Sequence, residues 1–229
     1  MSPQAKVKKV MERLEAMGSP DVQDYGKRFG IVAAKAYGIK TPELRALAKE
    51  LGRDHALALA LWNEPVHEAK KLAGMLADPK QVTGEMMERW AADFASWDIC
   101  DQCCYDLFDR TPFAYAKAAE WAHRPEEYVK RGGFALMAGL AVHDKKAPDE
   151  KFLAFLPHIE REAGDARNFV KKAVNWALRS IGKRNRTLNA AAIESAERIL
   201  KQDSPAARWV ASDTLRELRS ENVRRRLDA

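Results

Sequence analysis

A basic residue or pair followed by small and apolar residues recurs along this chain in segments with helical periodicity. The pattern occurs in Ala69-Lys-Lys-Leu-Ala, Val129-Lys-Arg-Gly-Gly, Val170-Lys-Lys-Ala-Val and Ala207-Arg-Trp-Val-Ala. The last three copies are spaced by about 40 residues, a period typical of stacked helical hairpins. Because hairpins of this kind bury their apolar faces against the next hairpin, the repeat restricts the fold more than any single motif does.

Apolar residues at steps of three and four predict helices over almost the whole chain, and strand-like alternation is nearly absent. Thr41 is the expected N-cap of one helix, with Pro42 in its first turn. Gly132-Gly133, inside another helix, indicates close packing between helices. The expected helices span residues 6–17, 22–36, 41–51, 54–63, 66–77, 81–95, 98–109, 113–123, 126–142, 149–163, 167–181, 189–201 and 206–218.

These observations predict an all-α fold, a right-handed α-solenoid of HEAT-like helical hairpins in a single domain over residues 1–229. The second helix of each hairpin should line a concave basic groove. Lys71, Arg131, Lys172 and Arg208, one from each copy of the basic pattern, would then follow a phosphodiester backbone. An acidic protein partner, or a purely solubilising role for these cations, is the alternative.

Composition excludes several classes of protein. Hydrophobic residues make up 46% and charged residues 31%, as in a globular rather than a disordered chain. No apolar run is long enough to span a bilayer, and the N-terminal MSPQAKVKKV lacks the apolar core of a signal peptide. We therefore expect a cytoplasmic monomer with no membrane partner, and the net charge of +6 favours nucleic acid, here the bacterial nucleoid.

The most cationic stretch is residues 168–185, an amphipathic helix that should end at Gly182. No Asp or Glu occurs from Ala166 through Ile193, so this stretch predicts a patch of one sign suited to a polyanion. Trp176 lies within it, although a core position for Trp176 and a solvated face for the lysines is the alternative. The cations of this patch are Lys171, Lys172, Arg179, Lys183, Arg184 and Arg186. Replacing Lys172 or Arg131 by Ala should weaken duplex binding with little loss of stability.

An acidic segment, residues 95–104, interrupts the basic pattern. Ser96 and Asp98 suit the start of a helix, and Trp97 and Asp101 are four residues apart, so they share a face. An aromatic ring beside a carboxylate can stabilise a cation. The alternative is a core tryptophan with Asp98 as a capping residue.

The three cysteines, Cys100, Cys103 and Cys104, resemble half of a zinc site, but no histidine pair supplies the other half. Buried reduced thiols are therefore expected. Glycine-rich phosphate loops and nucleophile elbows are also absent, so an enzyme of this sequence would use neither a metal nor a cofactor.

The order and spacing of several motifs resemble the HEAT-like-repeat DNA alkylation repair family, the AlkD-like DNA glycosylases, over nearly the whole chain. The motifs are Gly38-Ile39-x-Thr41-Pro42-x-x-Arg45-x-Leu47, Leu61-Trp62-x-x-Pro65-x-x-Glu68, Ser96-Trp97-Asp98-x-x-Asp101, Lys130-Arg131 and Lys172-Ala173-x-x-Trp176-x-Leu178-Arg179.

This resemblance implies a DNA glycosylase that excises cationic N3- and N7-alkylpurines from double-stranded DNA without base flipping. Trp97, Asp101 and Trp176 would form the catalytic cleft, and Arg131, next to Lys130, would contact DNA. Asp101 would stabilise the oxocarbenium-like sugar or orient water, while the tryptophans contact deoxyribose and lesion.

Two features depart from this pattern. Gly132-Gly133 replaces a more usual pair of small alanines, and the stretch between Arg131 and Trp176 is longer, with residues 143–150 as the expected loop. Both features resemble a divergent branch of the family, whose members bind branched DNA without detectable glycosylase activity. A non-catalytic protein that binds branched or distorted DNA is the alternative function.

Overall fold

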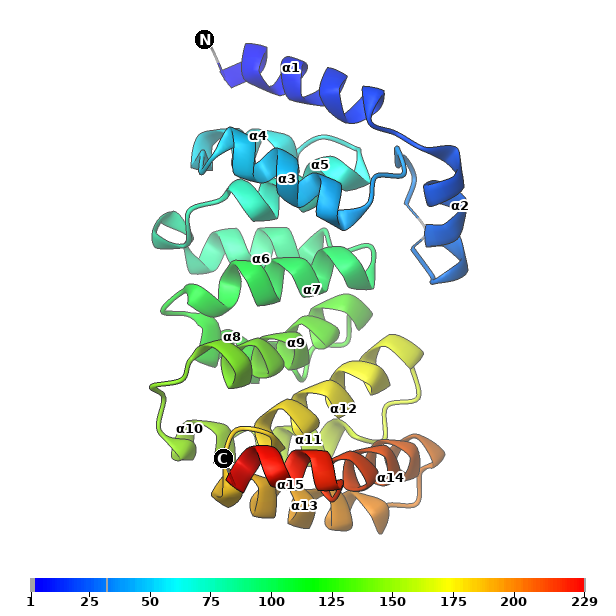
Figure 1. Cartoon of the computed structure of the whole chain (residues 1–229), viewed down its shortest axis with the longest axis vertical. Coiled ribbons are helices and arrows are strands. Elements are labelled where there is room, and N and C mark those ends of the chain that lie inside the picture. The colour runs from blue at the N-terminus through cyan, green and yellow to red at the C-terminus, as the bar shows by residue number, and fades with distance from the viewer. Residues whose placement is uncertain (1–2, 32, 229) are drawn as a thin grey trace. The chain divides into compact units, whose positions relative to one another are not determined.

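The computed structural model describes residues 3–31 and 33–228, and within these ranges the chain is helical with no strand. It forms two compact units, Met1–Thr111 and Pro112–Ala229, and each consists of helices packed as hairpins in layers (Figure 1). The predicted all-α architecture is confirmed. The prediction of a single domain over residues 1–229 stays a prediction.

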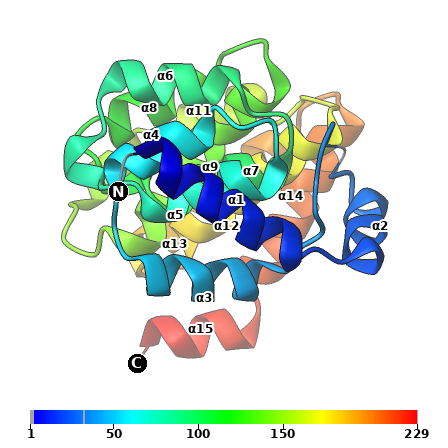
Figure 2. The same cartoon turned by 90° about the horizontal axis from the view of Figure 1, so that it is seen from above.

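The first unit is built around α5, which packs against α3, α4 and α7. Trp62 of α4 stacks on Trp90 of α6 at 3.9 Å between ring centroids, and both are fully buried. Helix α2 stands apart from the layers of α3, α4 and α5 in both views (Figures 1 and 2). The elements are α1 (Pro3–Ala16), α2 (Pro20–Arg28), α3 (Thr41–Leu51), α4 (His55–Trp62), α5 (His67–Leu76), η1 (Pro79–Gln81), α6 (Gly84–Ala92), α7 (Trp97–Asp106) and η2 (Phe108–Arg110).

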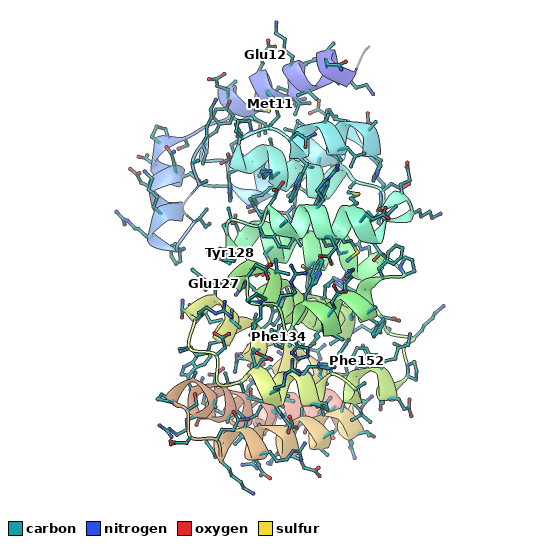
Figure 3. All side chains as sticks on the ribbon, turned by 180° about the vertical axis from the view of Figure 1, so that it is seen from behind. Met11, Glu12, Glu127, Tyr128, Phe134 and Phe152 are labelled. Carbon is teal, nitrogen blue, oxygen red and sulfur yellow. The ribbon has the colours of Figure 1, made fainter. Side chains whose placement is uncertain are left out.

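The second unit is centred on α9, which packs between α8 and α12, while α13 and α14 form the next hairpin. Phe134 of α9 and Phe152 of α10 are fully buried in its interior (Figure 3). The elements are α8 (Ala114–Trp121), α9 (Glu127–His143), α10 (Asp149–Leu153), α11 (Leu156–Glu162), α12 (Asn168–Gly182), α13 (Arg186–Leu200), α14 (Pro205–Leu218) and α15 (Glu221–Asp228).

A glycine makes the tight contact between α8 and α9 possible. A Cβ atom on Gly133 would lie 2.4 Å from the Ala122 nitrogen and 2.9 Å from the Ala118 oxygen, closer than backbone atoms can tolerate. The close packing predicted for the Gly132-Gly133 pair is thus confirmed at Gly133.

Three helix assignments were wrong, two of them for a local reason. The helix expected over residues 22–36 ends at Arg28, because Gly30 adopts a positive φ of 79°. The helix expected over residues 149–163 is divided into α10 and α11, because Pro157 cannot donate a hydrogen bond to the preceding turn. The short terminal helix α15 was not predicted. The N-cap of α3 is Lys40 rather than Thr41, and the Glu43 carboxylate accepts from the Lys40 N–H at 3.0 Å.

Candidate nucleic-acid interface

The first turn of α7 contains a buried polar network centred on Asp98. One Asp98 oxygen accepts from His67 Nε2 at 2.9 Å and from Lys71 Nζ at 3.1 Å. The other oxygen accepts from the Ser96 hydroxyl at 2.7 Å, so Ser96 bonds to Asp98 instead of capping the helix with its side chain. Lys71 also donates to Thr41 Oγ1 at 3.0 Å. Asp98 therefore connects α7 to α5 and, through Lys71, to α3.

Burial alone would raise the pKa of Asp98, but the hydrogen bond and charge of His67 and the charge of Lys71 outweigh it and lower that pKa well below its ordinary value. Asp98 is thus an ionised structural carboxylate. Lys71, predicted to bind DNA, is only 7% exposed and belongs to this network. The expectation that Lys71 lies in an open groove was wrong, because its charge is neutralised inside the first unit.

Trp97 and Asp101 lie one helical turn apart on α7, and both are half-buried. The Trp97 indole donates to the Phe29 carbonyl oxygen at 2.9 Å, which holds the ring against the segment after α2. Trp176, on α12, is half-buried in the second unit. The catalytic roles of these residues stay predictions.

The basic pair on α9 is buried rather than exposed. Lys130 forms ion pairs with Glu162 at 2.6 Å and Asp165 at 3.4 Å. Arg131 is 6% exposed, and its Nη1 donates to the Phe169 carbonyl oxygen at 2.5 Å. Both side chains therefore stabilise the packing of α9 against the segment that leads into α12.

The cations at the end of α12 do not form a patch of one sign, because α14 supplies carboxylates. Arg179 pairs with Asp213 at 2.9 Å and with Glu217 at 2.7 Å, and Lys183 pairs with Glu217 at 2.6 Å. This part of the predicted patch was wrong, since sequence proximity does not reveal a partner about 35 residues away.

Arg184 and Arg186, just after α12, also have partners within the second unit. Arg184 donates to the carbonyl oxygens of Ala141 and Asp144 at 2.7 and 2.9 Å, and Arg186 pairs with Asp228 at 2.6 Å. The Arg184 side chain therefore stabilises the packing of the second unit and is not part of an open cationic surface.

Among the cations predicted to bind DNA, those that stay accessible in the second unit form a smaller surface at the start of α12 and α14. Lys172 and Arg208 are exposed, although Asp203 lies 3.6 Å from Arg208. Lys171 Nζ lies 4.9 Å from the ring centroid of Trp209, which is 41% exposed. An exposed aromatic ring beside cations can contact nucleotides. Sequence reasoning missed Trp209, although its place directly after Arg208 in the repeated basic pattern was a usable signal.

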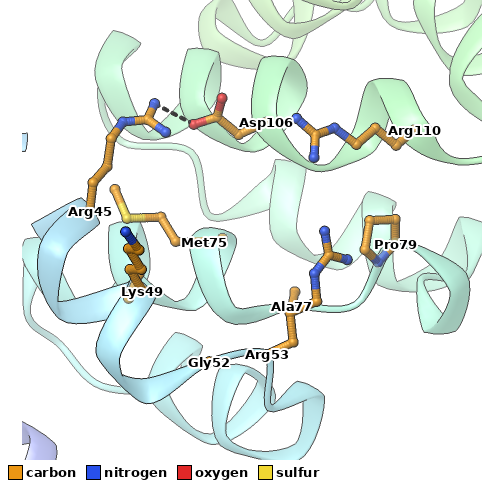
Figure 4. A pocket seen from close by; sticks show the side chains of 11 residues that line it. Arg45, Lys49, Gly52, Arg53, Met75, Ala77, Pro79, Asp106 and Arg110 are labelled. Atoms are coloured by element: carbon orange, nitrogen blue, oxygen red, sulfur yellow. Dashed lines mark hydrogen bonds and ion pairs between the residues drawn. The ribbon is translucent and has the colours of Figure 1, made fainter.

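A cluster of cations in the first unit was also missed. Arg45, Lys49, Arg53 and Arg110 line a groove of about 340 Å³, which we term the α3 cation cluster (Figure 4). Arg45 pairs closely with Asp106 at 2.6 Å, whereas Arg53 and Arg110 approach Asp78 and Asp109 only at 3.7 and 3.9 Å. Arg45 and Lys49 are four residues apart and share one face of α3, and Arg53 follows just after the helix, which was the signal in the sequence.

The cysteines are buried and reduced, as predicted. Burial raises the pKa of the Cys103 and Cys104 thiols well above the ordinary value, so both are protonated. Within the described residues, no group of three or more His, Cys, Asp or Glu side chains is placed to hold a metal ion. Nor do those residues include a helix long and apolar enough to cross a membrane.

Comparison with solved structures defines the class of protein. The chain is similar to "A new family of proteins related to the HEAT-like repeat DNA glycosylases with affinity for branched DNA structures", with a TM-score of 0.75 and 21% identity over 92% of this chain and 94% of that chain. A designed armadillo repeat protein matches with a TM-score of 0.36 and 16% identity over 76% of this chain and 91% of its own. The first likeness confirms the predicted class, an α-solenoid of HEAT-like repeats.

The sequence itself identifies the family. The profile of the family described as "DNA alkylation repair enzyme" matches residues 10–221, and the chain belongs to this family. The predicted resemblance is confirmed. No curated protein matches the chain by sequence.

Proposed function

We propose that this protein binds double-stranded DNA and is a DNA glycosylase that excises cationic N3- and N7-alkylpurines without base flipping. Membership of the DNA alkylation repair enzyme family is the observation that carries the proposal. Accessible cations in each unit support it, namely the α3 cation cluster in the first, and exposed Lys172 and Arg208 with half-buried Lys171 in the second. These side chains would bind phosphates and set the position of the duplex without reading its sequence.

In the proposed reaction the alkylated purine already carries a positive charge and leaves readily, so the barrier lies in the oxocarbenium-like sugar. The Asp101 carboxylate stabilises that charge or orients the attacking water. Trp97 contacts the deoxyribose and the lesion through its ring face. A contact of Trp176 with DNA stays a prediction. The half-burial of Trp97 and Asp101 on one turn of α7 supports this role, since both retain a surface for DNA.

Release of 7-methylguanine and 3-methyladenine from alkylated duplex DNA tests the glycosylase proposal. Protein in excess over DNA should release both bases above the rate of a protein-free control. No release at enzyme excess would refute excision while leaving DNA binding to be measured separately.

A second candidate function is binding of branched DNA without catalysis. The structure with a TM-score of 0.75 to this chain is of a protein family "with affinity for branched DNA structures", which supports this candidate. Competition between a four-way junction and a linear duplex of equal length measures the preference. Equal affinity for the two would count against a branched ligand.

A further inference from the structure

A second cavity in the first unit is unrelated to the α3 cation cluster. It has a volume of about 500 Å³ and lies among α2, the segment that follows it, and the starts of α3, α5 and α7. Its apolar wall is formed by Val22, Ile31, Ala33, Ala36, Ile39 and Pro42. His67, Glu68, Lys71, Thr41 and Asp98 form its polar part. Cavities of this size, apolar with a few convergent polar groups, commonly hold small organic ligands.

The wall after α2 is fixed by the Glu68 carboxylate. It accepts hydrogen bonds from the backbone N–H groups of Tyr37, Gly38 and Ile39 at 2.9, 2.8 and 3.3 Å. Gly38 has a φ of 80°, and a Cβ atom there would lie 2.1 Å from the Ser19 oxygen. The segment can follow this path only with glycine at position 38. The cavity is therefore preformed.

The polar part offers a ring nitrogen that makes no hydrogen bond within the protein. His67 is 8% exposed, and its Nε2 is the donor to the Asp98 carboxylate at 2.9 Å. His67 Nδ1 makes no hydrogen bond to any residue that the structure describes. Because His67 lines the cavity, this nitrogen is available to a ligand there.

The polar part also offers an unused donor. Lys71 Nζ donates to Thr41 and Asp98, and its third proton has no acceptor among the described residues. A free ring nitrogen and a free ammonium proton at the base of an apolar cavity can both bond to the hydrogen-bonding edge of a nucleobase, whose faces suit apolar walls. Lys27 and Lys40, both exposed, line the same cavity and suit an attached phosphate.

We propose that this cavity binds a nucleobase that has left the base stack, either in DNA with an unpaired nucleotide or as a free mononucleotide, and that unpaired DNA is the functional ligand. His67 Nδ1 forms a hydrogen bond with the base, and Lys71 Nζ donates to it. Lys40 contacts the phosphate, together with Lys27, which also pairs with Asp24 at 2.9 Å. This inference rests on the proposed DNA binding. In the proposed excision reaction, the damaged base stays within the duplex. The cavity would be a separate site, which binds a base that is already unpaired.

The experiment compares the affinity of the full chain for a duplex with one unpaired adenine and for the same duplex without it. We expect the bulged duplex to bind about tenfold more tightly, the scale of one stacked base. Ala36→Phe fills the cavity and should reduce this ratio to about one. Ala119→Phe, at another half-buried alanine on α8, should keep it. Thermal unfolding of both variants shows that each is folded.

The state of His67 gives an independent readout. The ¹⁵N resonance of His67 Nδ1 should shift when the bulged duplex binds and stay unchanged with the paired duplex. Equal affinities for the two duplexes with no Nδ1 shift would overturn the inference and leave the proposed duplex binding intact. A third outcome is that adenosine monophosphate binds, that Ala36→Phe blocks this binding, and that the bulged duplex is not preferred. This outcome would overturn DNA as the ligand of the cavity. Failure to bind any DNA would refute the proposed function itself.

Discussion

Asp98 and Asp101, three residues apart on α7, have different surroundings and therefore different roles. Asp98 is buried and accepts from His67, Lys71 and Ser96. Asp101 is half-buried, with a surface that a ligand can reach. Asp98 therefore has a structural role, and Asp101, which is closer to the surface, stays the predicted catalytic carboxylate.

Asp98→Asn should lower the free energy of unfolding by about 3 kcal/mol at pH 7, because it breaks a buried ion pair. The folded pKa of Asp98 is depressed, so its contribution is complete above the unfolded value near 3.9 and is lost as the pH falls through the lower folded value. Urea denaturation at pH 7 and pH 3 should show a smaller difference from wild type at pH 3. Asp203→Asn, at a fully exposed side chain, is the control and should change little.

Asp101→Asn should abolish base release from alkylated duplex while leaving the dissociation constant for DNA within about threefold, since a neutral amide cannot stabilise the cationic sugar. Single-turnover base release and anisotropy measure the two quantities. Excision that persists in this variant would assign the chemistry to another group.

Arg131→Ala and Lys172→Ala should differ, although the sequence predicted the same outcome for both. Arg131 is buried and hydrogen-bonded to the Phe169 carbonyl, so its loss should cost about 2 kcal/mol of stability. Lys172 is exposed, and its loss should stay within about 0.5 kcal/mol while weakening DNA binding. Thermal unfolding measures the stability of both variants, and fluorescence anisotropy measures their affinity for DNA. Equal melting temperatures would contradict the structural role of Arg131.

At the scale of the helices, apolar periodicity predicted most of the fold because each helix buries a stripe against the next hairpin. It failed where single residues override the period, as at Gly30 and Pro157. It failed for the candidate interface because a cation's surroundings depend on distant elements. Arg179 looks exposed in sequence, yet Asp213 and Glu217 of α14 neutralise it.

Gly133→Ala tests the contact between α8 and α9. The added methyl would press on the Ala122 and Ala118 backbone, so we expect a loss of about 2 kcal/mol in the free energy of unfolding. Gly74→Ala is the matched control on α5, since its Cβ would meet only Cys103 Sγ at 3.4 Å. Alanine favours helices, so the control should change little or stabilise. If both variants change the free energy of unfolding equally in denaturant titrations, α8 and α9 can move apart to accept the methyl group without loss of stability.

For the whole molecule, the net charge of +6 is less informative than its distribution, because many cations are already paired within each unit. The accessible remainder includes the α3 cation cluster in one unit, and exposed Lys172 and Arg208 with half-buried Lys171 in the other. These, rather than the full basic pattern, should set the salt dependence of DNA binding.

Replacing both Arg45 and Lys49 by Ala should lower the slope of log K against log salt by about 1.8, since each phosphate contact contributes about 0.9. Anisotropy titrations over a range of salt concentrations measure the slope. Lys145→Ala with Lys146→Ala, in the exposed loop after α9, is the control of equal charge and should leave the slope unchanged. Equal slopes for both double variants would place the DNA away from the α3 cation cluster.

The buried cysteines have a practical consequence for measuring motion. Cys100, Cys103 and Cys104 are inaccessible, and two of their thiols are held in the unreactive protonated form. Maleimide dyes should therefore not react with the native cysteines while the protein is folded. One cysteine introduced at an exposed site in each unit, such as Glu85→Cys and Arg216→Cys, would carry the only labels. Energy transfer between the dyes would then report how the distance between the units changes when DNA binds.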